Sequence, residues 1–357
     1  MQLHSRIQKT LRRLAAALLA ACLLAGAAQA AAPATDYLPV LMYHHFDEDT
    51  QGSKMIVSPE RFSEQMQALA DAGYTAVTPE QIVDYVDNGT PLPEKPVWIS
   101  MDDGYESNLT YAAPVLAENG LCATIYCIGV SVGKSTYKNL GVPIIPHFSY
   151  ETAKKWVDAG VINVQSHTYD MHNVSTLDVA DYRRGVLPRA DESLDGYMAA
   201  FRADFQKSNA AIRAAFGYDS LAFAYPYGLH NAVTEGMLQT LGVRLTVTIR
   251  EGINTLTQGD PACLYSMTRF NITDDVTGAQ LLDKIAEPAA EGHGLPLPGP
   301  HTTESKKARL LTRDVKERLP AGSLSFVRTA PGLEAGLTAP WAARAGSADS
   351  RVRPAGF

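Results

Sequence analysis

Val-Trp-Ile-Ser-Met-Asp-Asp-Gly, at residues 97–104, is an apolar run that ends in two adjacent carboxylates and a glycine. Such a run predicts a buried strand that delivers Asp102 and Asp103 to the carboxyl end of a sheet. Neighbouring side chains on a strand point to opposite faces, so both carboxylates reach one pocket only if Gly104 bends the chain at once. Taken alone, the dipeptide is also compatible with an Asp-Gly turn in which Asp103 caps a helix.

The sequence on both sides alternates between strand-like and helix-like patterns. Further strands are expected at 37–46, 74–77, 122–128, 161–165, 220–225, 244–249 and 263–268. Helices are expected near 58–73, 78–89, 107–119, 150–159, 192–216 and 231–241, and a surface loop near the site at 129–148. This alternation predicts an α/β fold with parallel strands and crossover helices. Because no GxGxxG or GxxxxGK[ST] fingerprint is present, we expect no nucleotide and a closed or nearly closed (β/α) barrel of about seven strands.

The two ends of the chain differ from this pattern. Residues 1–30 combine basic residues, an apolar run and Ala28-Gln29-Ala30, which predicts an export signal and a location in the periplasm or outside the cell. Cleavage after Ala30 is favoured, and a lipid anchor at Cys22 is the alternative. Residues 288–357 lack hydrophobic periodicity and carry a Pro-rich break, so we expect a mostly disordered tail.

Charge and cysteine content exclude several functions. Without the four basic residues of 1–30, 27 basic residues face 38 acidic ones, a net charge of −11. This excess argues against nucleic acid or an anionic membrane as partner. The remaining cysteines, Cys122, Cys127 and Cys263, are odd in number and lack CxxC spacing, which excludes a zinc-finger site.

Ionisable side chains gather where the predicted strands end. Asp102 and Asp103 follow one strand, His167 and His172 follow another, and His44 ends the first. Two histidines and a carboxylate from different segments suit a divalent metal and leave positions open for water and substrate. Each histidine alone is more typical of a hydrogen-bonded loop residue than of a ligand, and it is their combination with the Asp-Asp-Gly turn that indicates a metal site.

Three motifs make the chain similar to the polysaccharide deacetylases of carbohydrate esterase family 4, the NodB-homology group. Ser100-Met101-Asp102-Asp103-Gly104 resembles T-F-D-D-G, Ser166-His167-Thr168 with His172 resembles H-[ST]-…-H, and Ala224-Tyr225-Pro226-Tyr227-Gly228 resembles R-x-P-Y-G. The resemblance covers residues 37–285 and implies a distorted (β/α) barrel domain of the NodB-homology type over 37–287.

The resemblance also implies a role for each matching residue. Asp103, His167 and His172 would bind one divalent metal ion, which is zinc or else cobalt, nickel, iron or manganese. Asp102 would be the general base, and the backbone N–H of Tyr227 would stabilise the oxyanion. The rings of Tyr105 and Tyr227 are candidates for stacking on the sugar.

The sequence departs from the family pattern at three places. The two histidines are five residues apart instead of four. Ala224 replaces the arginine that orients the base, which predicts that this part of the network is missing. The late Leu-x-His motif with the general acid is absent, whereas Met42-Tyr43-His44-His45 resembles the circularly permuted poly-β-1,6-N-acetylglucosamine deacetylases, in which the acid comes first. This assigns His44 as general acid, with His45 as the alternative.

These features predict a metal-dependent N-deacetylase of a β-linked N-acetylglucosamine polymer. Poly-β-1,6-N-acetylglucosamine of biofilm matrix is the favoured substrate, and exopolysaccharide synthesis or export machinery is a candidate partner. A deacetylase of peptidoglycan or chitooligosaccharides is the first alternative. The second is a polysaccharide-binding module with little turnover.

Overall fold

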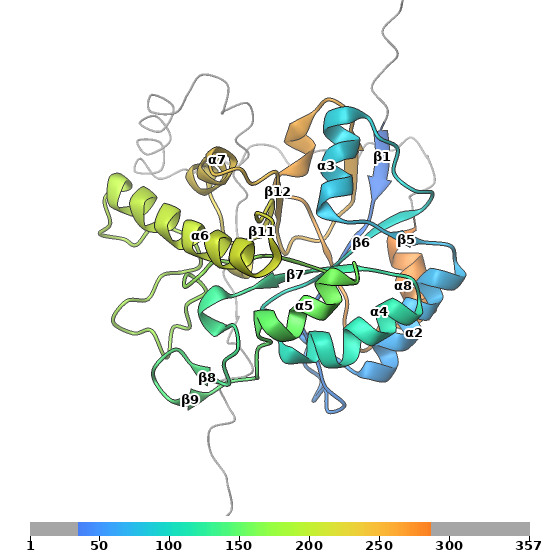
Figure 1. Cartoon of the computed structure of the whole chain (residues 1–357), viewed down its shortest axis with the longest axis horizontal. Helices are drawn as coiled ribbons and strands as arrows, with labels where there is room; N and C mark the ends of the chain where they lie inside the picture. Colours follow the sequence, from blue (N-terminus) through green and yellow to red (C-terminus); the bar gives the residue numbers. More distant parts are fainter. Residues whose placement is uncertain (1–34, 287–357) are drawn as a thin grey trace, which may run out of the picture. The chain divides into compact units, whose positions relative to one another are not determined.

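A curled parallel sheet forms the centre of the computed structural model, which describes residues 35–286, and helices lie around it (Figure 1). The predictions for residues 1–30 and 288–357 lie outside the described residues. The strands of this sheet are β2 (Val40–Tyr43), β5 (Thr75–Ala76), β6 (Pro96–Met101), β7 (Ala123–Cys127), β10 (Ile162–Ser166), β11 (Ala222–Ala224), β12 (Leu245–Val247) and β14 (Phe270–Asn271). Their order is β12-β11-β10-β7-β6-β2-β14, with β5 beside β6, and all pairings are parallel. The predicted α/β barrel-type fold is confirmed.

Helices connect and cover these strands, as crossover connections between parallel strands require. They are α2 (Pro59–Asp71), α3 (Pro79–Asn88), α4 (Ala113–Glu118), α5 (Tyr150–Asp158), α6 (Leu194–Phe216), α7 (Ala232–Thr240) and α8 (Gly278–Ile285). Their starts follow the sequence signals: Ser58 caps α2, and Thr78 forms a capping box at α3. In the described part of the chain, no helix is long and apolar enough to cross a bilayer.

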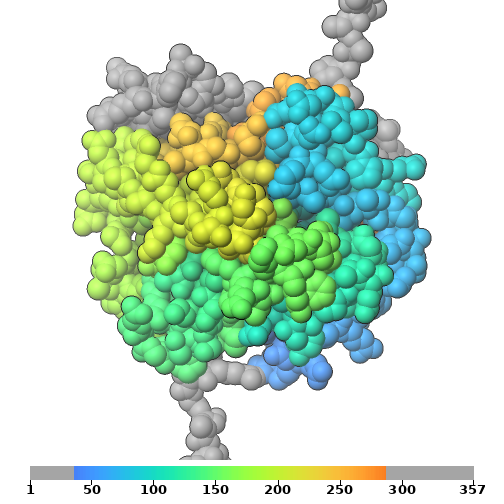
Figure 2. Space-filling model, in the orientation of Figure 1, coloured from blue at the N-terminus to red at the C-terminus, as the bar shows by residue number. Residues whose placement is uncertain are grey.

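Three smaller pairs complete the strand set. β1 (Thr35–Leu38) pairs antiparallel with β13 (Asn254–Thr257), and β3 (His45–Phe46) pairs with β4 (Ile56–Val57). A hairpin of β8 (Thr136–Tyr137) and β9 (Val142–Pro143) extends from the loop after β7, where only a surface loop is predicted. In the space-filling view the green and yellow-green segments around this hairpin form one continuous surface (Figure 2).

The segment that leads into β14 links the two ends of the curled sheet. Met267 donates its N–H to the Thr246 carbonyl and accepts a bond from the Thr248 N–H, both at 2.9 Å. A few residues on, Phe270 pairs with Leu41 of β2. The strand predicted at 263–268 is therefore wrong in its position: residues 261–264 form a short 3-10 turn that begins with a proline, and the strand comes after it.

The central strands are buried on both faces, as their continuous apolar sequences predict. Val97, Ile99 and Met101 pack in one core cluster with α2, α4 and α8. Trp98 faces the other way, is fully buried, and donates its indole N–H to the Thr124 hydroxyl at 2.8 Å. This packing holds β6 in place, and with it the position of the Asp-Asp-Gly turn that follows the strand.

Candidate active site

The carboxyl ends of neighbouring parallel strands bring the predicted residues to one edge of the sheet. Asp102 and Asp103 follow β6, His44 follows β2, and His167 follows β10. Tyr227 lies in the short turn after β11. Because the strands are parallel and adjacent, segments up to about 180 residues apart in sequence meet at this edge.

The Asp-Asp-Gly turn has the sharp bend that its sequence predicts. Asp103 and Gly104 both adopt left-handed backbone conformations, with φ of 71° and 80°. A Cβ at Gly104 would lie 3.0 Å from the Cβ of Cys127, so only glycine lets the turn approach β7 this closely. The bend turns the carboxylate of Asp103 toward two histidines, which favours a ligand role over a helix cap.

Asp103, His167 and His172 form a compact donor cluster. The Asp103 Oδ1 atom lies 3.6 Å from His167 Nε2 and 3.5 Å from His172 Nε2. One donor atom from each residue lies within 4.8 Å of the others. His167 Nδ1 bonds to the Ala224 carbonyl at 2.8 Å, which leaves Nε2 directed to the cluster. Burial lowers the pKa of His172 to about 4, despite the nearby Asp103 carboxylate, so its ring is neutral at pH 7. The donor set and its protonation fit a divalent metal.

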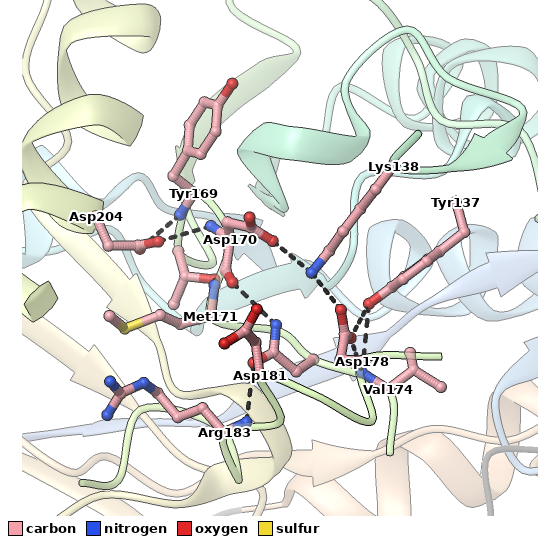
Figure 3. A network of polar contacts seen from close by, with 12 residues as sticks. Tyr137, Lys138, Tyr169, Asp170, Met171, Val174, Asp178, Asp181, Arg183 and Asp204 are labelled. Carbon is pink, nitrogen blue, oxygen red and sulfur yellow. Dashed lines mark hydrogen bonds and ion pairs between the residues drawn. The ribbon is translucent and has the colours of Figure 1, made fainter. Parts of the chain in front are cut away.

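The loop between the two histidines accommodates their five-residue spacing through contacts with α6. Thr168 begins it with a left-handed φ of 78°. The carboxylate of Asp204 on α6 then accepts the backbone N–H groups of Tyr169 at 2.8 Å and Asp170 at 2.7 Å (Figure 3). One side chain thus accepts two N–H groups that no helix or sheet uses, which fixes the path of the loop toward His172.

Arg269 corrects the prediction that the base-orienting arginine is missing. Its Nη1 and Nη2 atoms each donate to one oxygen of Asp102 at 2.7 Å, in a fully buried, two-point ion pair. Further bonds run from Arg269 to the Thr248 carbonyl and to the Ser100 hydroxyl. Ala224 indeed carries no charge, but the segment between β13 and β14 supplies the guanidinium from another direction.

Electrostatics keep Asp102 ionised. Burial alone would raise the pKa of its carboxyl, but the Arg269 guanidinium outweighs burial and holds that pKa well below the usual range. The three motifs do not predict a role for Arg269, because this residue lies between two strands and outside all of them. Only the pairing of the 267–271 segment with both β12 and β2 brings it to the site.

The side chains of the adjacent residues His44 and His45 have different surroundings. His44 is buried, and its Nε2 lies 3.9 Å from Asp102 Oδ2. Burial lowers the pKa of His44, while the nearby carboxylates oppose this shift. His45 points elsewhere, with its Nδ1 2.9 Å from the Ser107 hydroxyl and its Nε2 3.7 Å from Asp47. The geometry thus favours His44 over His45 as the group that faces a substrate.

The two candidate sugar-binding tyrosines flank the cluster. The centroids of the Tyr227 and His172 rings are 4.4 Å apart. The Tyr227 hydroxyl donates to the Asn173 carbonyl at 2.8 Å, and the backbone of Tyr227 is left-handed, with a φ of 58°. The Tyr105 ring, two residues after Asp103, lies 5.1 Å from the His45 ring. Burial raises the pKa values of both phenols, so both remain neutral at pH 7. These contacts hold the two rings at the rim of the donor cluster.

Comparison with known proteins identifies the family. The model of the polysaccharide deacetylase family matches residues 89–246, the range that holds the Asp-Asp-Gly turn, both cluster histidines and Tyr227. The chain carries a polysaccharide deacetylase domain. It is therefore a hydrolase that acts on carbon–nitrogen amide bonds.

Named relatives and solved structures agree with this assignment. The poly-β-1,6-N-acetyl-D-glucosamine N-deacetylase of Staphylococcus aureus is 26% identical over 232 residues, which are 65% of this chain and 73% of the relative. The structure of IcaB from Ammonifex degensii covers 70% of this deacetylase and 97% of its own chain, at 28% identity and a TM-score of 0.57. A de-N-acetylase from Aggregatibacter actinomycetemcomitans shares the fold, with a TM-score of 0.60 at 23% identity, covering 70% of this chain and all of its own.

Proposed function

We propose that this protein is a metal-dependent N-deacetylase of a β-linked N-acetylglucosamine polymer. The observation that carries the proposal is the convergence of the Asp103–His167–His172 cluster with the ionised, arginine-held Asp102 and with His44 at one sheet edge. A binding module needs neither the donor cluster nor a buried carboxylate with a depressed pKa. The geometry therefore favours turnover over the binding-module alternative.

The residues have distinct tasks in amide hydrolysis. A divalent metal held by Asp103, His167 and His172 would polarise the acetamide carbonyl. Asp102, which Arg269 orients and keeps ionised, accepts the proton of the attacking water. His44, whose Nε2 lies 3.9 Å from Asp102 Oδ2, is the general acid: its protonated ring donates to the leaving nitrogen, and the proton that Asp102 takes from the water restores it. The backbone N–H of Tyr227 stabilises the developing oxyanion.

The favoured substrate is poly-β-1,6-N-acetylglucosamine. Support comes from the Staphylococcus aureus relative, whose name carries this substrate, and from the early His44, which lies at the site although it precedes every other motif. Peptidoglycan and chitooligosaccharides are the alternatives. Export through the 1–30 segment, with Cys22 as alternative lipid anchor, would give the enzyme access to such a polymer outside the cytoplasm. A role in biofilm matrix and contact with export machinery belong to the same proposal.

Acetate release from purified protein tests this function. The wild type and Asp102→Asn would be incubated with poly-β-1,6-N-acetylglucosamine, chitooligosaccharides and peptidoglycan fragments, and free acetate measured. We expect release by the wild type, fastest on the β-1,6 polymer, and none by Asp102→Asn. Acetate release from only one of the other two polymers would show that this polymer, and not the β-1,6 polymer, is the substrate. No release from any polymer, although the protein binds them, would favour the binding module.

A further inference from the structure

His44, the proposed general acid, lies at a break between two short strands. β2 ends at Tyr43, β3 begins at His45, and His44 between them belongs to neither strand. β2 pairs with β6 in the main sheet, whereas β3 pairs with β4 outside it. Strand pairing by itself therefore does not fix His44, and its position depends on contacts with other segments.

The side chain of Asn108 provides such a contact. Asn108 is fully buried, and its Nδ2 atom donates to the His44 carbonyl at 2.7 Å. One residue earlier in the chain, the Ser107 hydroxyl accepts the Phe46 N–H at 3.1 Å. The backbone from His44 to Phe46 is thus bound by two consecutive side chains of one other segment.

This segment directly continues the Asp-Asp-Gly turn. At the start of the turn, the Asp102 N–H donates to the Tyr43 carbonyl at 2.9 Å. Two consecutive carbonyls at the end of the first strand are therefore bound from the same stretch of chain, that of Tyr43 by Asp102 and that of His44 by Asn108. The proposed base and the proposed acid thus belong to one hydrogen-bonded unit.

An unusual turn of helix carries Asn108. Residues Asn108–Ala112 form a single π-helical turn in front of α4, in which the Ala113 N–H donates to the Asn108 carbonyl. A regular α-helix through this point would leave the Thr110 carbonyl without a donor, because Pro114 has no N–H. The proline thus gives a local reason for the wider turn. Turns of this type are rare and occur frequently at functional sites.

We propose that Asn108 is a positioning residue for the general acid: its amide holds the His44 backbone so that the ring keeps its place beside Asp102. The inference rests on the proposed function and deepens it, because it assigns a task in proton delivery to a residue outside the three motifs. The His44 Nε2 atom lies 3.9 Å from Asp102 Oδ2. A shift of the backbone would move this atom away from the leaving nitrogen, and proton transfer is sensitive to such shifts.

Two substrates with different leaving groups separate this role from a general loss of structure. The acetamide releases an amine, and its C–N bond breaks only as the nitrogen receives a proton from the His44 ring. The ester para-nitrophenyl acetate releases a stabilised phenolate, which leaves without that proton. Both reactions need the same attacking water, whose proton Asp102 accepts. The ratio of the amide rate to the ester rate therefore reports on the acid, and it does not depend on the fraction of folded protein.

The experiment measures both rates for the wild type, Asn108→Leu and His44→Gln, with hydrolysis by Asp102→Asn subtracted as background. The amide substrate is the polymer from which the wild type releases acetate fastest. Asn108→Leu should lower the amide rate about 10-fold or more and leave the ester rate close to that of the wild type. His44→Gln should change the ratio in the same direction and further. Leucine has nearly the shape of asparagine and also removes Asn108 Oδ1, a buried atom without a hydrogen-bond partner in the described part of the chain, so the variant should fold.

Asn108→Ala is a second variant, whose smaller side chain leaves room for a water at the His44 carbonyl. Its ratio should fall as well, because a water does not fix the carbonyl as the buried amide does. Asn119→Leu is the matched control, since Asn119 Nδ2 donates to the Val115 carbonyl at 2.8 Å at the far end of α4. This control should keep the wild-type ratio.

Equal losses of both rates in the Asn108 variants would show a merely structural role and overturn the proposal. Unchanged amide rates in these variants would overturn it too. In both cases acetate release by the wild type would still support the deacetylase. If the wild type released no acetate from any polymer, the proposed function would fail, and the role of Asn108 would fail with it.

Discussion

At the residue scale, the pair of Asp102 and Arg269 determines the chemistry that the site can perform. A buried carboxylate without a partner would be protonated at neutral pH and useless as a base. The two-point bond from Arg269 reverses that tendency and fixes the direction of both oxygens. The Ser100 hydroxyl and the Thr248 carbonyl hold the guanidinium in turn, so buried contacts orient Asp102, the proposed base.

Arg269→Met should therefore impair both stability and turnover. Leaving the Asp102 carboxylate buried without its partner should cost about 3–5 kcal/mol of unfolding free energy, and acetate release should fall at least about 10-fold. Chemical denaturation and acetate assays measure the two effects. Arg269→Met combined with Asp102→Asn should recover stability but not activity. Arg269→Lys should recover activity only in part, because a lysine cannot make the two-point bond. An Arg269→Met protein with normal turnover would contradict this role.

Substitution of the two adjacent histidines should separate their roles. His44→Gln should lower kcat by about 100-fold or more, the range for a general acid, with metal content unchanged. His45→Gln should have a smaller effect, because His45 contacts Ser107 and Asp47 rather than Asp102. Steady-state acetate release measures both. If His45→Gln were the more damaging change, the assignment of the acid would be wrong.

At the element scale, α6 acts on the site through the loop that carries His172. Asp204 lies on this helix, and its carboxylate binds two consecutive N–H groups of the loop. Burial raises the pKa of Asp204 to about 6, although both N–H bonds favour the ionised form. The two N–H bonds thus fix the loop, although burial of the carboxyl opposes its ionisation.

Asp204→Ala should weaken metal binding by about 10- to 100-fold, as loss of a ligand-orienting contact does in other metal sites. The reason is that Tyr169 and Asp170 lose the acceptor that fixes the loop. Competition with a chromogenic chelator measures the dissociation constant directly. Asp219→Ala is the matched control, because Asp219 is an exposed carboxylate that pairs with Arg213 at the far end of α6. Equal metal affinity in the two variants would show that Asp204 does not position the loop.

At the scale of the elements, the sequence predicts the helices and strands whose residue pattern lies within the element itself. The strand before Asp102 is a largely apolar run, the strand before His167 alternates Ile162 and Val164 with polar residues, and both strands are present. The β8–β9 hairpin and the position of β14 are not predicted. Their two-residue strands have no periodicity to detect, and their pairing depends on partners distant in the sequence.

At the scale of the whole molecule, closure of the curled sheet determines which residues meet. The cluster residues are predictable because each follows a strand whose carboxyl end is expected at one edge. Arg269 is not, because it reaches the site through an irregular segment that pairs with β12 on one side and leads into β14 on the other. Motif spacing thus predicts the donors, whereas the groups that orient and surround them require the tertiary structure.

The central claim is that one metal ion in the Asp103–His167–His172 cluster supports deacetylation. The most direct measurement removes metal with a chelator, titrates zinc back, and records bound zinc and acetate release from poly-β-1,6-N-acetylglucosamine together. We expect activity to be lost on removal and to return in proportion to zinc, with a plateau at one ion per chain. His172→Ala should bind zinc weakly and remain inactive under the same titration. Full acetate release by the metal-free protein, or recovery in His172→Ala at one equivalent of zinc, would contradict the claim.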